Sequence, residues 1–184
     1  MRWDELFDDL EAQFDAVDAA DLVAEVADRS RRETAALRLV DRLRPVVGGL
    51  ISLRLAGVGA VTGTLTGVGA DWLLLADVGG REDLVAAHAV LSIGGLAAQS
   101  AAPFSEGQVA ARLTLAYALR ALVRDRSSVA VTLIDGSTAA GTLDRAGADF
   151  VELAEHPAGE ARRRGAVRAV RTYSLHALAV VTRA

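Results

Sequence analysis

Two stretches of the chain, 78 residues apart, are nearly identical. Residues 63–76 read GTLTGVGADWLLLA and residues 141–154 read GTLDRAGADFVELA, and eight of the fourteen positions match without a gap. Trp72 in the first stretch is replaced by another aromatic residue, Phe150, in the second. A match of this length at a fixed offset indicates an internal duplication. We therefore expect two copies of one structural unit.

Hydrophobic alternation with period two predicts five short strands in each copy. Glycine-rich turns separate the strands, and Asp135-Gly136 is typical of a tight hairpin. Five short strands in an open sheet would leave two exposed edges, so each copy is expected to curl into a small barrel. The predicted strands are Leu50–Leu55, Ala60–Leu65, Trp72–Ala76, Leu84–Ala87 and Val90–Ile93, and then Val129–Leu133, Ser137–Leu143, Phe150–Glu155, Arg163–Val170 and Leu175–Val181.

Helical patterns precede each copy. Ser30 and Glu33 have capping-box spacing, which predicts a helix from Ser30 that Pro45 stops. A second capping box at Ser105 and Gln108 predicts an amphipathic helix before the second copy. Near the N-terminus, five apolar residues at steps of four and three predict a helix with one apolar face. They are Trp3, Phe7, Leu10, Phe14 and Val17.

These patterns predict an α+β fold, in which an N-terminal helical segment is followed by two tandem barrels, each a helix plus five strands. The expected domains are an acidic helical head at 1–45, a first barrel at 46–98, a linker with the amphipathic helix at 99–126, and a second barrel at 127–184. Both aromatic residues of the repeat are expected to be core residues beside the helix of their own copy.

Charge and composition narrow the function. Residues 1–29 hold ten acidic residues and two arginines, a net charge of −8, so the remainder carries +4 of the total of −4. The absence of cysteine and lysine removes several covalent nucleophiles and any thiolate metal site. The uncharged stretch 84–104 is broken by Gly94-Gly95 and Pro103, so we read it as a strand and a loop rather than a membrane span. An acidic N-terminus is no signal peptide, and a cytoplasmic bacterial protein is expected.

No catalytic or cofactor motif fits its required context. Gly57, Gly59 and Gly63 imitate a dinucleotide fingerprint, but strand sequence follows where a helix should begin. Asp71 and Asp149 occupy the same turn of the two copies, which favours a structural role. The three histidines lack metal-ligand spacing, and His88, in a predicted strand, is expected to be packed rather than to act as a ligand. We expect no enzyme activity, no cofactor and no metal.

Several segments resemble the Sm-like superfamily, which includes bacterial Hfq. LIDGSTAAGTL at 133–143 and DFVEL at 149–153 are similar to its first motif. VAAHAV at 85–90 is similar to the second motif of Hfq and places His88 at its histidine, whereas the second copy is expected to read RRRGAV at 162–167 there. The resemblance implies a small barrel with a preceding helix, RNA binding, and rings of six or seven modules.

The resemblance and the arginine clusters together favour a non-enzymatic RNA-binding protein. Arginine suits phosphate contacts and stacks on bases. The candidate RNA-binding residues are Arg162, Arg163, Arg164, Arg168 and Arg171, with Arg120 and Arg124 on the middle helix. The alternative is a protein–protein adaptor or assembly module that docks on a partner, or on its own copy, through the apolar stripe Trp3 to Val17.

Overall fold

The computed structural model describes residues 22, 24–96, 113–157, 162–163 and 165–183. The chain divides into two compact units, residues 1–37 and 38–184. In the first unit, residues 24–36 are helical. Ser30 lies inside this helix, where its carbonyl accepts a hydrogen bond from the Thr34 hydroxyl at 2.9 Å, so the predicted helix start at Ser30 is wrong. The apolar stripe Trp3 to Val17 lies outside the described residues.

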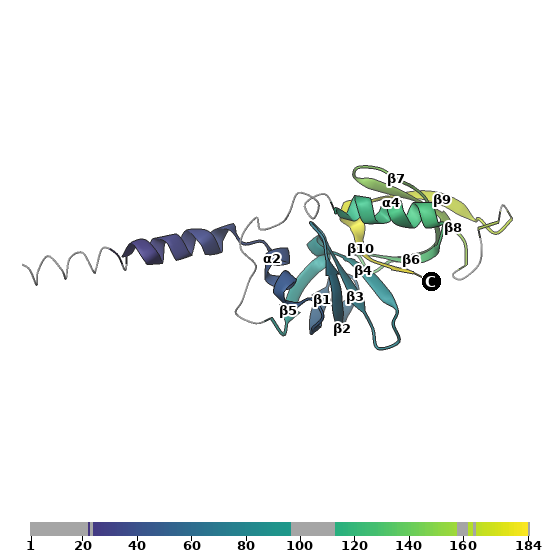
Figure 1. Ribbon diagram of the computed structural model, residues 1–184. Coiled ribbons are helices and arrows are strands. Elements are labelled where there is room, and N and C mark those ends of the chain that lie inside the picture. Colours follow the sequence, from purple (N-terminus) through teal and green to yellow (C-terminus); the bar gives the residue numbers. More distant parts are fainter. Residues whose placement is uncertain (1–21, 23, 97–112, 158–161, 164, 184) are drawn as a thin grey trace, which may run out of the picture. The chain divides into compact units, whose positions relative to one another are not determined.

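The second unit contains two similar halves, residues 38–96 and 113–183 (Figure 1). The first half consists of α2 (Leu39–Leu43), η1 (Arg44–Val46), β1 (Leu50–Leu55), β2 (Gly59–Val68), β3 (Trp72–Ala76), β4 (Glu82–Ala86), η2 (Ala87–Ala89) and β5 (Val90–Gly94). The second half consists of α4 (Leu115–Asp125), β6 (Ser128–Leu133), β7 (Thr138–Ala146), β8 (Phe150–Glu155), β9 (Ala169–Ser174), η3 (Leu175–Ala177) and β10 (Leu178–Arg183).

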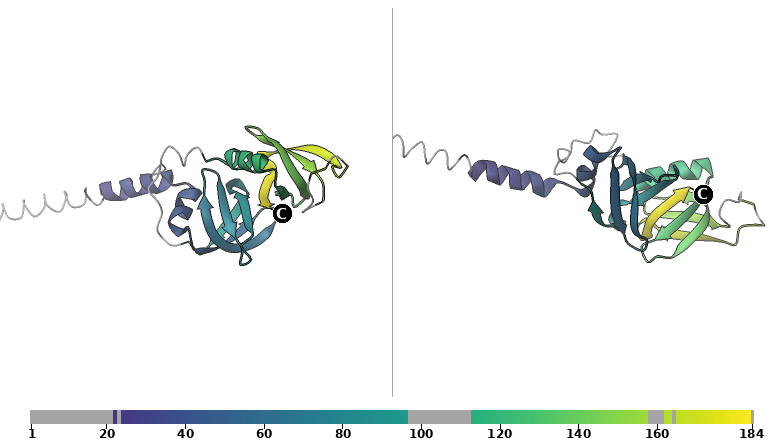
Figure 2. Two further views of the ribbon diagram at one scale, coloured as in Figure 1. Left: turned by 45° about the vertical axis from the view of Figure 1, so that its right-hand side comes forward. Right: turned by 90° about the horizontal axis from the view of Figure 1, so that it is seen from below.

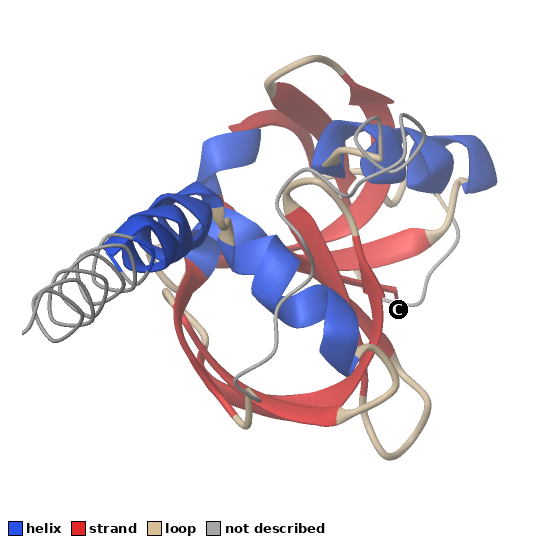
Figure 3. Cartoon of the chain, turned by 60° about the vertical axis from the view of Figure 1, so that its left-hand side comes forward, coloured by secondary structure: helices blue, strands red, loops and turns tan. Residues whose placement is uncertain are grey.

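Within the described residues, the ten strands form one antiparallel sheet in the order β5-β1-β2-β3-β4-β10-β6-β7-β8-β9. The prediction of two separate barrels is therefore wrong. The edge of the first half is covered by β10 of the second half, which pairs with both β4 and β6. Figure 2 shows β10 between the strands of the two halves, and Figure 3 shows how strongly the strands curve. Pairing between the halves, rather than closure of each half, covers this edge.

The duplication itself is visible in the backbone. The β2–β3 pair shifts register between Leu65 and Gly67, and the β7–β8 pair shifts at the positions 78 residues later, between Leu143 and Arg145. Gly63 and Gly141 each allow a close approach of the neighbouring strand, closer at Gly141, since an added Cβ would meet the carbonyl oxygens of Ala76 and Ala154. The two copies therefore repeat one fold, as the sequence predicted.

The offset between the copies grows from 78 to 88 residues beyond β8, because the connection from β8 to β9 is longer than that from β3 to β4. The predicted strand Arg163–Val170 is consequently wrong, and β9 begins at Ala169. From there Leu175 corresponds to Ala87. Their backbone N–H groups bond equivalent carbonyls, those of Asp149 and Asp71.

Helix α4 bridges the two halves. Thr114 caps it by accepting the N–H of Tyr117, and Asp71 in the first half accepts the N–H of Leu115 at 2.6 Å. The indole of Trp72 donates to the Leu113 carbonyl at 2.7 Å. Trp72 thus lies beside the helix of the other half rather than its own, and both Trp72 and Phe150 are only half-buried, which corrects their prediction as core residues.

Candidate functional site

The two halves place equivalent histidines next to each other. His88 lies in η2 and His176 in η3, the turns that follow β4 and β9. Both side chains are exposed, and their ring centroids are 5.8 Å apart with the rings tilted by 58°. A pair of exposed imidazoles offers flat faces for stacking and nitrogens for hydrogen bonds.

Backbone contacts hold the two turns in place. The N–H of Ala56 donates to the Ala89 carbonyl, and the N–H of Ile134 donates to the Ala177 carbonyl, both at 2.9 Å. The hairpin turns that supply these donors lie against each other, because a Cβ on Gly57 would stand 2.5 Å from the nitrogen of Gly136. Gly57 also has φ +70°, so glycine is required there on two grounds. The histidine pair is therefore carried by a fixed backbone frame.

The sequence matches His88 to a motif but predicts a packed residue there, whereas the structure exposes it in η2, and no such match is available for His176. It assigns RRRGAV at 162–167 to the second copy of the motif, whereas the structure places those residues in the connection between β8 and β9. The repeated dipeptide His-Ala, at 88–89 and 176–177, was the available signal. The dipeptide does not align with the rest of the repeat, because its two copies are 88 residues apart and those of the repeat are 78 apart.

Three of the seven predicted RNA-binding arginines have partners within the protein. Arg162 pairs with Asp144 at 2.7 Å and Arg171 with Glu155 at 3.0 Å. Arg120 donates to the carbonyls of Ala146 and Gly147 at 3.3 and 2.9 Å. Exposed ion pairs of this kind contribute little stability, but they lower the charge available to a phosphate.

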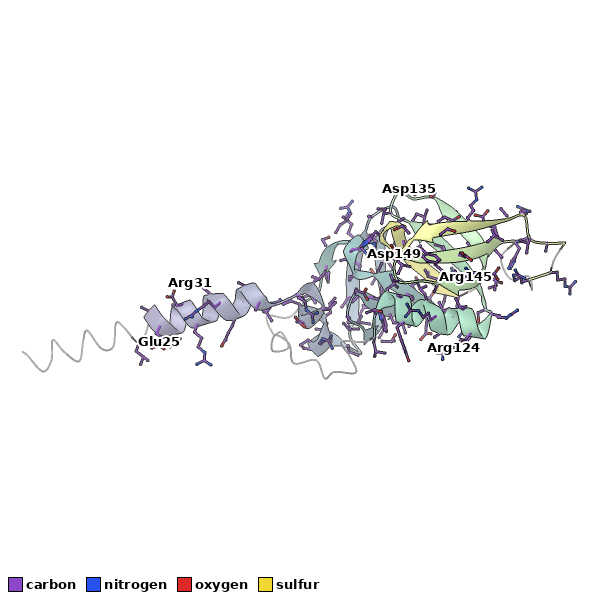
Figure 4. All side chains as sticks on the ribbon, turned by 90° about the horizontal axis from the view of Figure 1, so that it is seen from above. Glu25, Arg31, Arg124, Asp135, Arg145 and Asp149 are labelled. Atoms are coloured by element: carbon purple, nitrogen blue, oxygen red, sulfur yellow. The ribbon has the colours of Figure 1, made fainter. Side chains whose placement is uncertain are left out.

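The other predicted arginines differ from these three. Arg124, Arg163 and Arg168 are exposed and make no side-chain hydrogen bond or ion pair within the described residues. Figure 4 shows Arg124 on α4. Arg164 lies outside the described residues, as does the whole predicted partner interface Trp3, Phe7, Leu10, Phe14 and Val17.

A cavity of about 630 Å³ opens on the second half. Arg168, Arg171 and Tyr173 line it from the β9 side. Ser137, just before β7, lines it from the other side and follows the turn whose Ile134 N–H bonds η3. Its volume lies in the range of small-molecule pockets. Among the described residues it contains Arg168, which has no side-chain partner, and the Arg171–Glu155 pair. It therefore offers an anion one available cation and one that Glu155 already neutralises.

Glu155 also organises Tyr173 at this cavity. The Tyr173 hydroxyl donates to Glu155 Oε1 at 2.6 Å. Burial, together with the hydrogen bond and negative charge of Glu155, raises the pKa of Tyr173 to about 12. Tyr173 is therefore a neutral donor with a carboxylate partner, and it is not poised for proton transfer near neutral pH.

The third histidine has a structural environment. His156 is buried, and its Nδ1 lies 3.0 Å from the Pro157 carbonyl, which can only accept. In the neutral ring Nδ1 is then the donor, so Nε2 accepts from the Thr142 hydroxyl at 2.8 Å. Both ring nitrogens are satisfied inside the protein.

Within the described residues, no cluster of three or more histidine, cysteine, aspartate or glutamate side chains could hold a metal ion. No described helix is both long and apolar enough to cross a bilayer.

Comparison with known proteins identifies no matching family model, no curated relative and no similar solved structure.

Proposed function

We propose that this protein binds single-stranded RNA at the turns that carry His88 and His176. The observation that carries this proposal is the pair itself: two copies of one exposed imidazole, 5.8 Å apart on a fixed backbone frame. Unpaired bases stack on flat side chains, histidine among them. The resemblance of the His88 segment to the second Hfq motif supports the same function.

The phosphate contacts are assigned to the arginines without partners. Arg168 is exposed at the cavity of the second half, and its side chain makes no bond within the described residues. Residues 38–184 hold sixteen arginines against thirteen acidic residues, so this unit has a net charge of +3 although the chain is acidic. A small positive excess suits moderate, salt-dependent binding rather than tight binding.

The test measures binding of a fluorescent single-stranded RNA to the full chain across a salt series. Replacing both His88 and His176 with Ala should weaken binding about tenfold or more, because stacking contributes roughly 1–3 kcal/mol per base. Arg168→Ala should reduce the salt slope by about 0.7, the value for one single-strand phosphate contact. Arg81→Ala is the matched control, since Arg81 is exposed at the opposite end of β4 from His88. Unchanged affinity in the double histidine variant would refute the proposal.

The acidic N-terminal segment separates this proposal from the adaptor alternative. Residues 38–184 form a compact unit, so they can be compared with the full chain. If the arginines bind phosphates, removing residues 1–37, which carry a net charge of −7, should tighten RNA binding, most strongly at low salt. If the protein is an adaptor that acts through the stripe Trp3 to Val17, neither the full chain nor the truncated chain binds RNA, and the truncated chain loses its protein partner.

A further inference from the structure

The cavity of the second half is lined by groups that the first half does not repeat. Tyr173 occupies the position of Val85, which is fully buried. Glu155 occupies the position of Asp77, whose Oδ1 accepts two backbone N–H groups of its own turn, at 2.7 and 2.9 Å. The chemistry of the cavity therefore belongs to one copy and is not a consequence of the repeated fold.

Glu155 has one oxygen without a partner at the cavity wall. Its Oε1 accepts from the Tyr173 hydroxyl at 2.6 Å and lies 3.0 Å from the Nε of Arg171. Its Oε2 accepts no hydrogen bond from the described residues, although the Glu155 side chain is only 21% exposed. A carboxylate oxygen that is largely withdrawn from water ordinarily has a partner. Oε2 can therefore accept a hydrogen bond from a bound molecule.

Arg168 supplies the charge of the cavity. Its backbone N–H donates to the Glu155 carbonyl at 2.8 Å, which holds the two residues side by side. Its side chain lines the cavity and has no hydrogen bond or ion pair within the described residues. Arg171 is already neutralised by Glu155, so the two arginines and one glutamate leave a single positive charge. The cavity thus fits one negative charge.

The group that reaches Oε2 should be a neutral donor. An ammonium group at Oε2 would stand close to the guanidinium of Arg171, which is paired with the same carboxylate. Like charges at such a distance repel each other. A hydroxyl group donates to Oε2 without this cost. The ligand is therefore expected to carry a hydroxyl next to its anionic group.

Apolar side chains form another part of the cavity wall. Leu133 ends β6, Ala139 lies in β7 and Pro157 follows β8, and all three line the cavity. The volume of about 630 Å³ lies in the range of pockets that hold small organic molecules. An apolar group as large as a phenyl ring therefore has room beside the polar groups.

We propose that this cavity binds an α-hydroxy acid, a small organic monoanion with a hydroxyl beside its carboxylate and an apolar side chain. The carboxylate pairs with Arg168, the hydroxyl donates to Oε2 of Glu155, and the apolar side chain lies against Leu133 and Ala139. A phosphate monoester fits less well, because it carries a charge of about −1.5 to −2 at pH 7. Arg168 is also the proposed phosphate contact, but this proposal does not depend on RNA binding, and its tests contain no RNA.

The first experiment compares three ligands of one carbon skeleton by NMR titration of the full chain. Phenyllactate has the hydroxyl, phenylpropionate has hydrogen in its place, and phenylalanine has an ammonium group. Phenyllactate should bind about tenfold or more tightly than phenylpropionate, because only its hydroxyl bonds the charged Glu155. Phenylalanine should also bind more weakly than phenyllactate. Absence of phenyllactate binding, equal affinity for phenylpropionate, or tightest binding of phenylalanine would each overturn the proposal.

The second experiment repeats the titrations with variants of the two polar contacts. Arg168→Ala should weaken binding of phenyllactate and phenylpropionate alike, by about tenfold or more, since it removes the partner of the carboxylate. Arg163→Ala is the matched control, because Arg163 is an exposed arginine of the same β8–β9 connection, has no side-chain partner within the described residues and does not line the cavity. Equal losses in the two variants would show general charge attraction and refute the site.

Glu155→Gln tests the hydroxyl contact. Its amide has one acceptor oxygen, which Tyr173 occupies, so phenyllactate and phenylpropionate should bind this variant with similar affinity. Chemical shifts of residues outside the cavity show whether each variant retains the fold. An undiminished preference for phenyllactate in folded Glu155→Gln would mean that Oε2 does not accept the hydroxyl, and the proposed pose would be wrong.

Discussion

The two halves of the sheet come from one duplicated sequence, yet they differ at the strand that ends each copy. In the first half, β4 is covered by β10, and Val85 on it is fully buried. In the second half, the equivalent strand β9 has no partner on its outer side within the described residues, and Tyr173 at the equivalent position is half-buried at a cavity. The same strand of the repeat is therefore paired on both sides in the first half (β4) and on one side only in the second half (β9), within the described residues.

A second difference concerns the helix. Asp71 in the first half accepts an N–H from the first turn of α4, whereas the side chain of its counterpart Asp149 has no hydrogen-bond or ion-pair partner within the described residues. Of the two equivalent aspartates, the one where the two halves meet forms a side-chain hydrogen bond, and the one before β8 forms none within the described residues. Paired substitutions at equivalent positions should reveal this asymmetry as differences in stability.

The largest effect is expected at the glycines of the bent strands. A Cβ at Gly141 would lie 2.0 Å from the Ala154 carbonyl oxygen, and a Cβ at Gly63 would lie 2.9 Å from that of Ala76. Because backbone must move in both cases, Gly141→Ala should lower the free energy of unfolding by about 3 kcal/mol and Gly63→Ala by about 1 kcal/mol. Urea unfolding of the full chain measures both. Equal losses would show that the strand bend is equally tight in the two copies.

The next effect concerns the buried pair of Thr142 and His156, which exists only in the second half. Thr142→Val removes the hydroxyl that donates to His156 Nε2 and leaves a buried acceptor unpaired. The free energy of unfolding should fall by about 2 kcal/mol, within the usual range for an unsatisfied buried group. Thr64→Val is the matched control, since Thr64 is the first-half equivalent and is only half-buried. If both variants lose the same stability, the His156 contact is not the cause.

A smaller difference is expected between the two aspartates. Asp71→Ala removes the acceptor for the N–H of Leu115 and should cost about 1 kcal/mol, as loss of a helix-capping contact does. Asp149→Ala should change the unfolding free energy of the monomer by less than about 0.5 kcal/mol, as for surface substitutions. A larger loss at Asp149 would mean that its carboxylate has a structural role within one chain.

The local part of this architecture could be predicted from the sequence. Alternation and turn residues predicted the bounds of Leu50–Leu55, Trp72–Ala76 and Phe150–Glu155 as the structure has them. The position of β9 could not be found, because the copies lose their constant offset after β8 and the arginine run resembled the missing strand. Strand pairing between β4 and β10 joins residues about a hundred positions apart, and no local pattern encodes it.

The candidate site could not be predicted for the same reason. The segment of His88 matches a motif, but its place in a predicted strand favoured a packed residue, and the match to His176 is lost because its offset has changed. The arginines were selected as a charge cluster, but sequence cannot show that Arg162 and Arg171 have carboxylate partners in the fold. Pairing of this kind depends on which strands become neighbours.

The smallest expected effect is a pH dependence of stability that arises in the second half only. Tyr173 occupies the position of Val85, so only the second half has a titrating group there. Its pKa is raised from 10.0 to about 12 by burial and by Glu155. Because the folded pKa lies above the unfolded value, the stabilisation is fully present below pH 10 and is lost as the pH rises toward 12. Tyrosinate absorbance should show one residue ionising near pH 12, and Tyr173→Phe should remove that step. Glu155→Gln should move it to lower pH, because the negative charge is gone while burial remains. A step near pH 10 for Tyr173 in the wild type would mean that the β9 edge is more open than its contact with Glu155 indicates.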